Sequence, residues 1–268
     1  MKKLFIMNVM SFNIRCDKSS DQQNSWQYRK DFAAQMILFY DVDILGTQEV
    51  FKNQLEDLLE RLPGYNFFGV GRADGKDKGE HSAIFYKREK FDVEKSGNFW
   101  LSQEPEKIGS KGWDAACERV VTWAIFTEIK SGTKFVLFNT HFDHIGEVAR
   151  KESAILLRKR MIEIAGALPI IATGDLNLPP NSEAVETLLK DDFLLDAKKA
   201  ANFVYGPSWS FHDFGRIPIE YRQLIDYILV DKSVRVNKYA CISETLNTTF
   251  LSDHNPVFAQ IEFVSSFI

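Results

Sequence analysis

Apolar residues follow both strand and helix patterns in the first part of the chain. Residues 4–13, LFIMNVMSFN, form a nearly continuous apolar run that is typical of a strand buried on both faces. Residues 26–40 and 52–62 carry apolar side chains at helical spacing, and Pro63-Gly64 ends the second of these helices. Residues 43–50, DILGTQEV, predict a buried strand between them.

Strand patterns dominate the middle of the chain. We predict strands over residues 65–70, 81–86, 91–97, 119–129 and 134–142. The last two are joined by Ser131-Gly132-Thr133, which predicts a hairpin turn.

The second half of the chain mixes both patterns. We predict a helix over residues 146–168, with Ile155, Ile162 and Ala165 on one side, and a short helix that Ser182 caps and that runs to Lys190. Further strands are predicted over residues 169–175, 223–230, 236–244 and 255–263.

These elements indicate the fold class. Around ten strands, many joined by hairpins and few separated by helices, predict an α/β (α+β) fold in which two packed, mostly antiparallel or mixed β-sheets are flanked by helices. The composition is 45% hydrophobic, and neither a linker nor a short internal repeat divides the chain. We therefore expect one domain over residues 1–268.

Composition narrows the choice of partner and compartment. A net charge of −4 gives no sign of the basic charge that non-specific nucleic-acid binding requires. Cys16, Cys117 and Cys241 are far apart and form no CxxC pair, which argues against structural zinc. The first apolar run is broken at Asn8 and is unconvincing as a signal peptide, so we expect a cytoplasmic protein or the mature form of an exported one. No segment has membrane-spanning length, and no obligate protein partner is predicted.

Polar side chains stand at the ends of many predicted strands. Such loops at one edge of a rigid sheet pair are a natural place for a reaction site. The strand-end residues are Asn13, Glu49, Asn139, His141, Asp175, Asn177, Asp226, Asp253 and His254.

These residue types suit one kind of chemistry. Oxygen ligands without thiols favour Mg²⁺, Ca²⁺ or Mn²⁺ over zinc. A histidine beside a carboxylate has its tautomer and orientation fixed. Arg119, at the start of a strand, provides a bidentate clamp for an anion. Carboxylates, a hard metal, arginine and histidine together fit hydrolysis of a phosphoester, which needs several catalytic contributions at once.

The motifs SFNIR, TQEV, ERVVTWAIF, NTHFDH, GDLN, LIDYIL and SDHNP occur in this order over residues 5–263. In this respect the chain resembles the endonuclease/exonuclease/phosphatase superfamily of deoxyribonuclease-like, metal-dependent phosphoesterases. The resemblance implies a four-layer sandwich of two mixed sheets and an enzyme that hydrolyses phosphoesters with Mg²⁺ or Mn²⁺. The motif set is specific to the superfamily but not to a substrate.

The resemblance also implies roles for the strand-end residues. Glu49 would ligate the metal beside Asn13, with Asp253 nearby as a further ligand. Asp175 would orient or deprotonate the attacking water, and Asn177 would hold the phosphate or the nucleophile. His254 would stabilise the phosphate, with Asp226 as its carboxylate partner. His141 would bind phosphate or protonate the leaving oxygen, supported by Glu80. Arg119 and Asn139 are expected to contact the substrate.

Three functions stay open on the sequence alone. The first is a metal-dependent phosphodiesterase that cleaves a small or single-stranded nucleotide-type substrate by in-line attack of an activated water. In that case Phe211 or Trp209, in the aromatic stretch 205–223, would stack on a base. The second is a phosphomonoesterase of the sugar- or inositol-phosphate type, and the third is a non-catalytic binding protein on the same fold.

Overall fold

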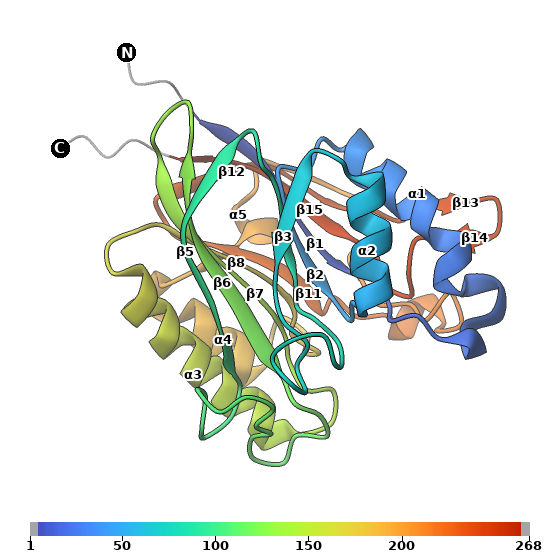
Figure 1. Ribbon diagram of the computed structural model, residues 1–268, viewed down its shortest axis with the longest axis horizontal. Helices are drawn as coiled ribbons and strands as arrows, with labels where there is room; N and C mark the ends of the chain where they lie inside the picture. The colour runs from blue at the N-terminus through green and yellow to red at the C-terminus, as the bar shows by residue number, and fades with distance from the viewer. Residues whose placement is uncertain (1–4, 264–268) are drawn as a thin grey trace.

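Two β-sheets pack face to face in the computed structural model, which describes residues 5–263 (Figure 1). The seven-stranded sheet has the order β10-β12-β15-β1-β2-β4-β3, with bounds Phe203–Tyr205, Val234–Cys241, Val257–Phe263, Ile6–Asn13, Ile44–Gln48, Ile84–Lys87 and Tyr65–Phe68. The six-stranded sheet has the order β5-β6-β7-β8-β11-β9, with bounds Phe91–Trp100, Val120–Glu128, Lys134–His141, Ile170–Asp175, Asp226–Val230 and Leu195–Asp196. A separate hairpin pairs β13 (Thr245–Leu246) with β14 (Thr249–Phe250).

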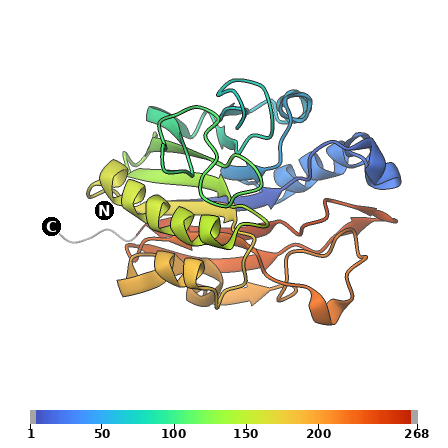
Figure 2. The same ribbon diagram turned by 90° about the horizontal axis from the view of Figure 1, so that it is seen from below.

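Helices cover the outer face of each sheet. Helices α1 (Trp26–Phe39) and α2 (Lys52–Arg61) pack on the seven-stranded sheet, and α3 (Glu147–Ala165) and α4 (Glu183–Leu189) pack on the six-stranded sheet. Figure 2 shows α3 and α4 side by side. The result is a four-layer sandwich of two mixed sheets, as predicted. The remaining short helices are α5 (Ala197–Ala200), η1 (Ser19–Asn24), η2 (Lys190–Asp192) and η3 (Ile219–Tyr221).

The burial of β1 explains its largely apolar sequence. Met7 and Val9 belong to the core between the two sheets, whereas Met10 and Phe12 belong to the core beneath α1 and α2. All four side chains are fully buried. A strand with helices on one side and a second sheet on the other has no face exposed to solvent, so apolar side chains are favoured on both faces.

Helix α3 is shorter than predicted and turns a different face to the sheet. It ends at Ala165, where Gly166 takes a φ of 56°, a positive value that glycine adopts without steric cost. The expected apolar side was wrong for two of its three residues: Ile155 is 46% exposed and Ile162 is 52% exposed. Ala154, Leu157, Met161 and Ala165 are buried instead, since steps of three or four residues from Ala154 keep this stripe on the sheet.

The other predicted elements are present with small shifts at their ends. Strand β1 begins at Ile6 rather than at residue 4, and residue 4 lies outside the described part of the chain. Ser182 caps α4 by accepting a hydrogen bond from Val185, as predicted. Four strands of two or three residues, β9, β10, β13 and β14, were not predicted.

Strand direction brings polar ends to one edge of the molecule. Strand β1 runs parallel to β2, and β7 runs parallel to β8, so these four strands end on the same side. Strands β11 and β15 are antiparallel to β8 and β1, so they begin there. At the other end of the sheet, β1 begins and β15 ends side by side, where Ile6 pairs with Glu262 (Figure 1). Within residues 5–263, none of the helices has the length and apolar character needed to cross a bilayer.

Candidate active site

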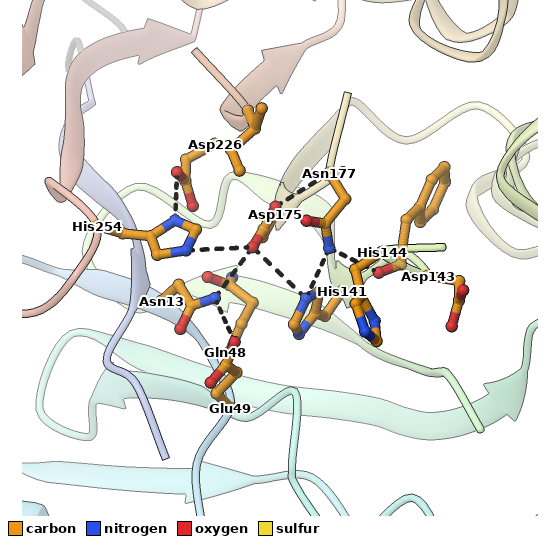
Figure 3. A network of polar contacts seen from close by, with 12 residues as sticks. Asn13, Gln48, Glu49, His141, Asp143, His144, Asp175, Asn177, Asp226 and His254 are labelled. Atoms are coloured by element: carbon orange, nitrogen blue, oxygen red, sulfur yellow. Dashed lines mark hydrogen bonds and ion pairs between the residues drawn. The ribbon is translucent and has the colours of Figure 1, made fainter. Parts of the chain in front are cut away.

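Strand pairing places three carboxyl and imidazole groups opposite one another. In the antiparallel register Asp226 faces Asp175, and in the parallel register His141 faces Asp175. His254, just before β15, turns toward the same point (Figure 3). Its Nδ1 lies 2.9 Å from Asp226 Oδ2, and its Nε2 lies 3.8 Å from Asp175 Oδ2. Asp175 therefore has an imidazole on each side.

The charges of these groups set their protonation. Burial and the neighbouring Asp226 raise the pKa of Asp175 to about 7. Burial alone would lower the pKa of His254, but the carboxylates of Asp226 and Asp175 raise it to about 10. His254 is therefore a cation at neutral pH, held by Asp226 with its Nε2 toward Asp175.

Asn177 and His141 form the second half of the site. The Asn177 amide Nδ2 lies 3.0 Å from His141 Nε2 and donates to the carbonyl of Phe142. Its backbone N–H donates to Asp175 Oδ1, and Asn177 itself takes a φ of 52°. Burial and the nearby Arg119 and Arg72 hold the pKa of His141 well below its usual value, so this imidazole is neutral.

Asn13, Glu49 and Asp253 lie next to this group. Asn13 Nδ2 donates to Glu49 Oε1 at 3.2 Å and to Asp175 Oδ2 at 3.0 Å. Arg15 Nη1 lies 3.9 Å from Glu49 Oε2 and 3.5 Å from Asp253 Oδ2, and so bridges two acids from opposite ends of the chain. Glu49 itself is held with a φ of 61° at the end of β2.

This donor set fits a divalent cation. Burial raises the pKa of Asp253, and the charge of Glu49 raises it further against the opposing charge of His254. Burial and Glu49 also raise the pKa of Glu80. Carboxylates are therefore crowded here beyond what Arg15 neutralises, and a hard dication would relieve that repulsion. The oxygens of Asn13, Glu49 and Asp253 are ligands of the kind that Mg²⁺ and Mn²⁺ prefer.

Arg119 shares a small cavity with Glu49. Arg119, Arg72, Glu80 and His141 line a small cavity together with Glu49. Arg119 is only 4% exposed, and its Nη1 has no hydrogen-bond partner among the described residues. A buried guanidinium with a free N–H next to the metal-ligand candidate suits the capture of an anion.

Two predicted residues differ from their expected roles. Glu80 pairs with Arg72, with Oε2 2.5 Å from Nη1, and the hydrogen bond found at His141 comes from Asn177. Asn139 is not part of the site. It is fully buried between the sheets, where its amide donates to the carbonyls of Thr47 and Ala83 and its oxygen accepts from Gln48 and Thr173. The expected substrate contact of Asn139 is wrong because all its hydrogen-bonding capacity is used inside the molecule.

Four residues near the site had no role in the sequence prediction: Arg15, Arg72, Asp143 and His144. Arg15 belongs to the quoted motif SFNIR, two residues after Asn13, and this position was the available signal. Arg72 lies in an irregular loop that carries no pattern. His81 is structural, since both its ring nitrogens contact backbone oxygens, of Val50 and Lys76.

Phe211 packs against the imidazole of His254. Its ring centroid lies 4.8 Å from that of His254, and its backbone bridges to Gln223 and His254. Trp209 instead lies beneath Arg222, with the guanidinium carbon 4.4 Å from the ring centroid. Of the two aromatic candidates, Phe211 is therefore the one beside the site.

Comparison with known proteins agrees with this geometry. The model of the Endonuclease/Exonuclease/phosphatase family matches residues 10–254. The crystal structure of an endonuclease/exonuclease/phosphatase from Bacteroides vulgatus is 44% identical, covers 97% of this chain and 99% of that one, and superposes with a TM-score of 0.94. The fold and the site define a protein of the phosphoester-hydrolase class.

The chain belongs to the endonuclease/exonuclease/phosphatase family. A mannosyl-6-phosphatase of Bacteroides thetaiotaomicron VPI-5482 is 39% identical, with 95% of this chain and 99% of that one covered and a TM-score of 0.90. The exoribonuclease subunit Ccr4 of the CCR4-Not complex of Mycosarcoma maydis is 25% identical over 255 residues, which are 82% of this chain and 37% of that protein. The chain spans 30% to 65% of the length of the curated relatives it matches.

Proposed function

We propose that the protein hydrolyses phosphoester bonds with a divalent metal, Mg²⁺ or Mn²⁺, by attack of water on phosphorus. The observation that carries the proposal is the contact of Asp175 with His254, His141 and Asn13 at one point. The proposed base Asp175, the His254 cation and the metal-ligand candidate Asn13 thus meet at one point. A non-catalytic binding protein would gain nothing from this arrangement, because burying charged groups close together costs stability.

Each side chain has a separate role in the proposed hydrolysis. Asp175 accepts the proton of the attacking water, since its raised pKa leaves it basic enough at neutral pH. His254, kept protonated by Asp226, donates from Nε2 to the phosphate oxygen on which charge develops. Asn177 holds the nucleophile or the phosphate in line. A metal bound by Asn13, Glu49 and Asp253 would supply Lewis-acid polarisation of the phosphate.

His141 acts in our proposal as a phosphate-binding donor. Its Nε2 faces the Asn177 amide, so the ring proton is on Nδ1 in the neutral imidazole. The low pKa of His141 makes it a poor proton donor to a leaving oxygen in the free protein. Of the two roles that the family resemblance implies, phosphate binding is the one that this environment favours.

We infer that the substrate is a phosphomonoester of a small polar molecule, with a sugar phosphate as first candidate. A terminal phosphate carries up to two negative charges, and Arg119 and Arg72 add cationic side chains beside the metal-ligand candidate Glu49. The mannosyl-6-phosphatase relative, similar over nearly the whole chain, supports this order. We therefore rank the monoester ahead of the nucleotide-type diester that the sequence alone favoured.

A nucleotide-type phosphodiester is the second candidate. Phe211, packed against His254, is the observation in its favour, because an aromatic ring at the reaction centre offers a stacking surface for a base. The Ccr4 relative is named as an exoribonuclease, at lower identity and over part of its length.

A substrate panel tests the proposal. Sugar 6-phosphates, p-nitrophenyl phosphate, bis(p-nitrophenyl) phosphate and a single-stranded RNA oligonucleotide are assayed with Mg²⁺ or Mn²⁺ and again with EDTA. We expect metal-dependent turnover that is greatest with the sugar phosphates and is lost with EDTA. A greater rate with the diesters would favour the second candidate, and no turnover of any phosphoester would contradict the proposal.

Variants connect the turnover to the site. Asp175→Ala and His254→Ala are each expected to lower kcat by about 10²–10⁴-fold. Asp226→Asn, which removes the charge that holds His254 protonated, is expected to lower it by about 10–100-fold. Asp92→Asn changes an exposed acid on β5 and serves as the control. Wild-type rates in the Asp175 and His254 variants would remove the mechanism.

A further inference from the structure

His144 is an exposed residue at the edge of the site with one specific contact. Its Nδ1 lies 3.0 Å from Arg119 Nη2. A guanidinium has donors only, so Nδ1 must be the acceptor and the imidazole must be neutral with its proton on Nε2. Burial and the charge of Arg119 lower the pKa of His144, which favours this neutral form.

The neighbouring Asp143 holds the same arginine from another side. Its Oδ2 lies 3.5 Å from Arg119 Nε and accepts the backbone N–H of Cys117 at 3.2 Å. Its Oδ1 accepts the N–H groups of Ile145 and Gly146 at the start of α3. Asp143 is thus fixed by backbone bonds, and the segment that carries it places His144 next to it (Figure 3).

Together these contacts leave one end of Arg119 free. Nε is directed to Asp143 and Nη2 to His144. Within residues 5–263, Nη1 has no partner although Arg119 is 96% buried. Arg119 also lines the cavity shared by Glu49 and His141. A guanidinium held at two nitrogens has lost its rotational freedom before any ligand arrives, which favours binding through the third.

We propose that His144 is a positioning residue that fixes Arg119, through the acceptor Nδ1, so that the free Nη1 binds the phosphate group of the substrate. The inference rests on the proposed phosphoester hydrolysis and deepens it. His144 contacts neither the reacting atoms nor the metal ligands; it acts through Arg119. Because the contact with phosphate is present both before and in the transition state, its loss raises KM and leaves kcat nearly unchanged.

Three substitutions separate this role from a structural one. His144→Ala removes the acceptor. His144→Asn restores an oxygen acceptor at the position of Nδ1, since both atoms are attached to Cγ. Arg119→Met removes the group through which His144 is proposed to act. A double-mutant cycle then compares the effect of His144→Ala in wild type and in the Arg119→Met background.

The first readout is binding of inorganic phosphate, measured by isothermal titration calorimetry with Mg²⁺ present. We expect His144→Ala to weaken phosphate binding about three- to tenfold, since a charge-assisted contact loses its alignment. His144→Asn is expected to restore most of the affinity. In the Arg119→Met background, His144→Ala is expected to have no further effect.

The second readout is steady-state kinetics with the best substrate of the panel. A similar rise in KM with kcat within about twofold of wild type is expected for His144→Ala. Unchanged phosphate affinity in His144→Ala, no recovery in His144→Asn, or an equal loss in the Arg119→Met background would each overturn the inference. Failure of the proposed function has a different signature, because wild type would then turn over no phosphoester whatever the binding results.

Discussion

At the scale of single residues, neighbouring charges give two buried imidazoles different charge states. His254 lies between Asp226 and Asp175, which raise its pKa to about 10. His141 is as deeply buried but lies near Arg119 and Arg72, and its pKa is well below the usual value. One ring is therefore a fixed cation and the other a neutral donor. The sequence contains both histidines, but only the folded neighbours determine their charge.

The same scale explains which site residues could be predicted. Glu49 and Asp175 stand where apolar runs end, and His254 stands just before one begins. In the fold, Asn13 contacts both Glu49 and Asp175, and His254 lies beside Asp175. Asn139 stands two residues before His141 on the same strand and has the same pattern. Asn139 lies deeper between the sheets than His141. Its distance from the end of the strand therefore distinguishes this structural amide from the site residue His141. Arg15 was not predicted because it lies beyond the end of β1, with a φ of 59°, and belongs to no strand or helix pattern.

Thiol reactivity provides a prediction with a defined pH dependence. Burial raises the pKa of both Cys16 and Cys241 to about 12, and both side chains are at most 1% exposed. Cys117 is partly exposed. At pH 8 we expect the native protein to react with Ellman's reagent rapidly at Cys117 alone, and the unfolded protein to react at all three thiols.

The sign of the effect on stability follows from the raised pKa values. The unfolded thiols ionise near about pH 8.5, whereas the folded ones stay protonated to higher pH. Stabilisation by these groups is thus complete below about pH 8.5 and is lost as the pH rises toward 12. Urea unfolding at pH 8 and pH 10 measures this fall. Three rapidly reacting thiols in the native state at pH 8 would contradict the buried positions of Cys16 and Cys241.

At the scale of elements, periodicity predicted where strands and helices lie better than which face they bury. Strand β1 was identified because both its faces are covered and its sequence is largely apolar. Helix α3 was identified too, but Ile155 and Ile162 were assigned to the wrong side. Its buried stripe contains Ala154 and Ala165, small residues that allow close approach to the sheet and carry a weak hydrophobic signal. Strands of two or three residues, such as β9 and β10, are too short to show any period.

The contact between the two sheets leads to a prediction at Gly46 of β2. A Cβ atom there would overlap Thr173 Oγ1 and lie 2.7 Å from Asn139 Oδ1, both in the buried polar group between the sheets. Gly46→Ala is expected to lower the free energy of unfolding by at least about 2 kcal/mol, because the facing backbones cannot move apart without opening the core.

Gly64→Ala is the matched control for this measurement. Nothing lies within 4 Å of a Cβ at Gly64, and we expect a change within about 0.5 kcal/mol. Urea denaturation followed by circular dichroism compares the two variants with wild type. Equal stability of Gly46→Ala and Gly64→Ala would show that the sheets are not packed as closely at this point as described.

At the scale of the whole molecule, strand direction brings the site residues to one edge of the two sheets. Parallel pairs β1–β2 and β7–β8 end at one edge, and antiparallel β11 and β15 begin there. The fold class followed from the number of strands and the scarcity of helices between them. The strand order could not be predicted from the sequence. Strands such as β1 and β15 pair although they are more than 200 residues apart, and the local pattern of apolar residues does not record that pairing.

The central claim is that acids from both ends of the chain bind one divalent cation beside Asp175. Mn²⁺ binding, followed by electron paramagnetic resonance of the free ion, tests it directly in wild type, Glu49→Gln, Asp253→Asn and the control Asp92→Asn. We predict saturable binding to wild type and to the control, and affinity at least about tenfold weaker in each of the other two variants. Wild-type Mn²⁺ affinity in either Glu49→Gln or Asp253→Asn would contradict the claim.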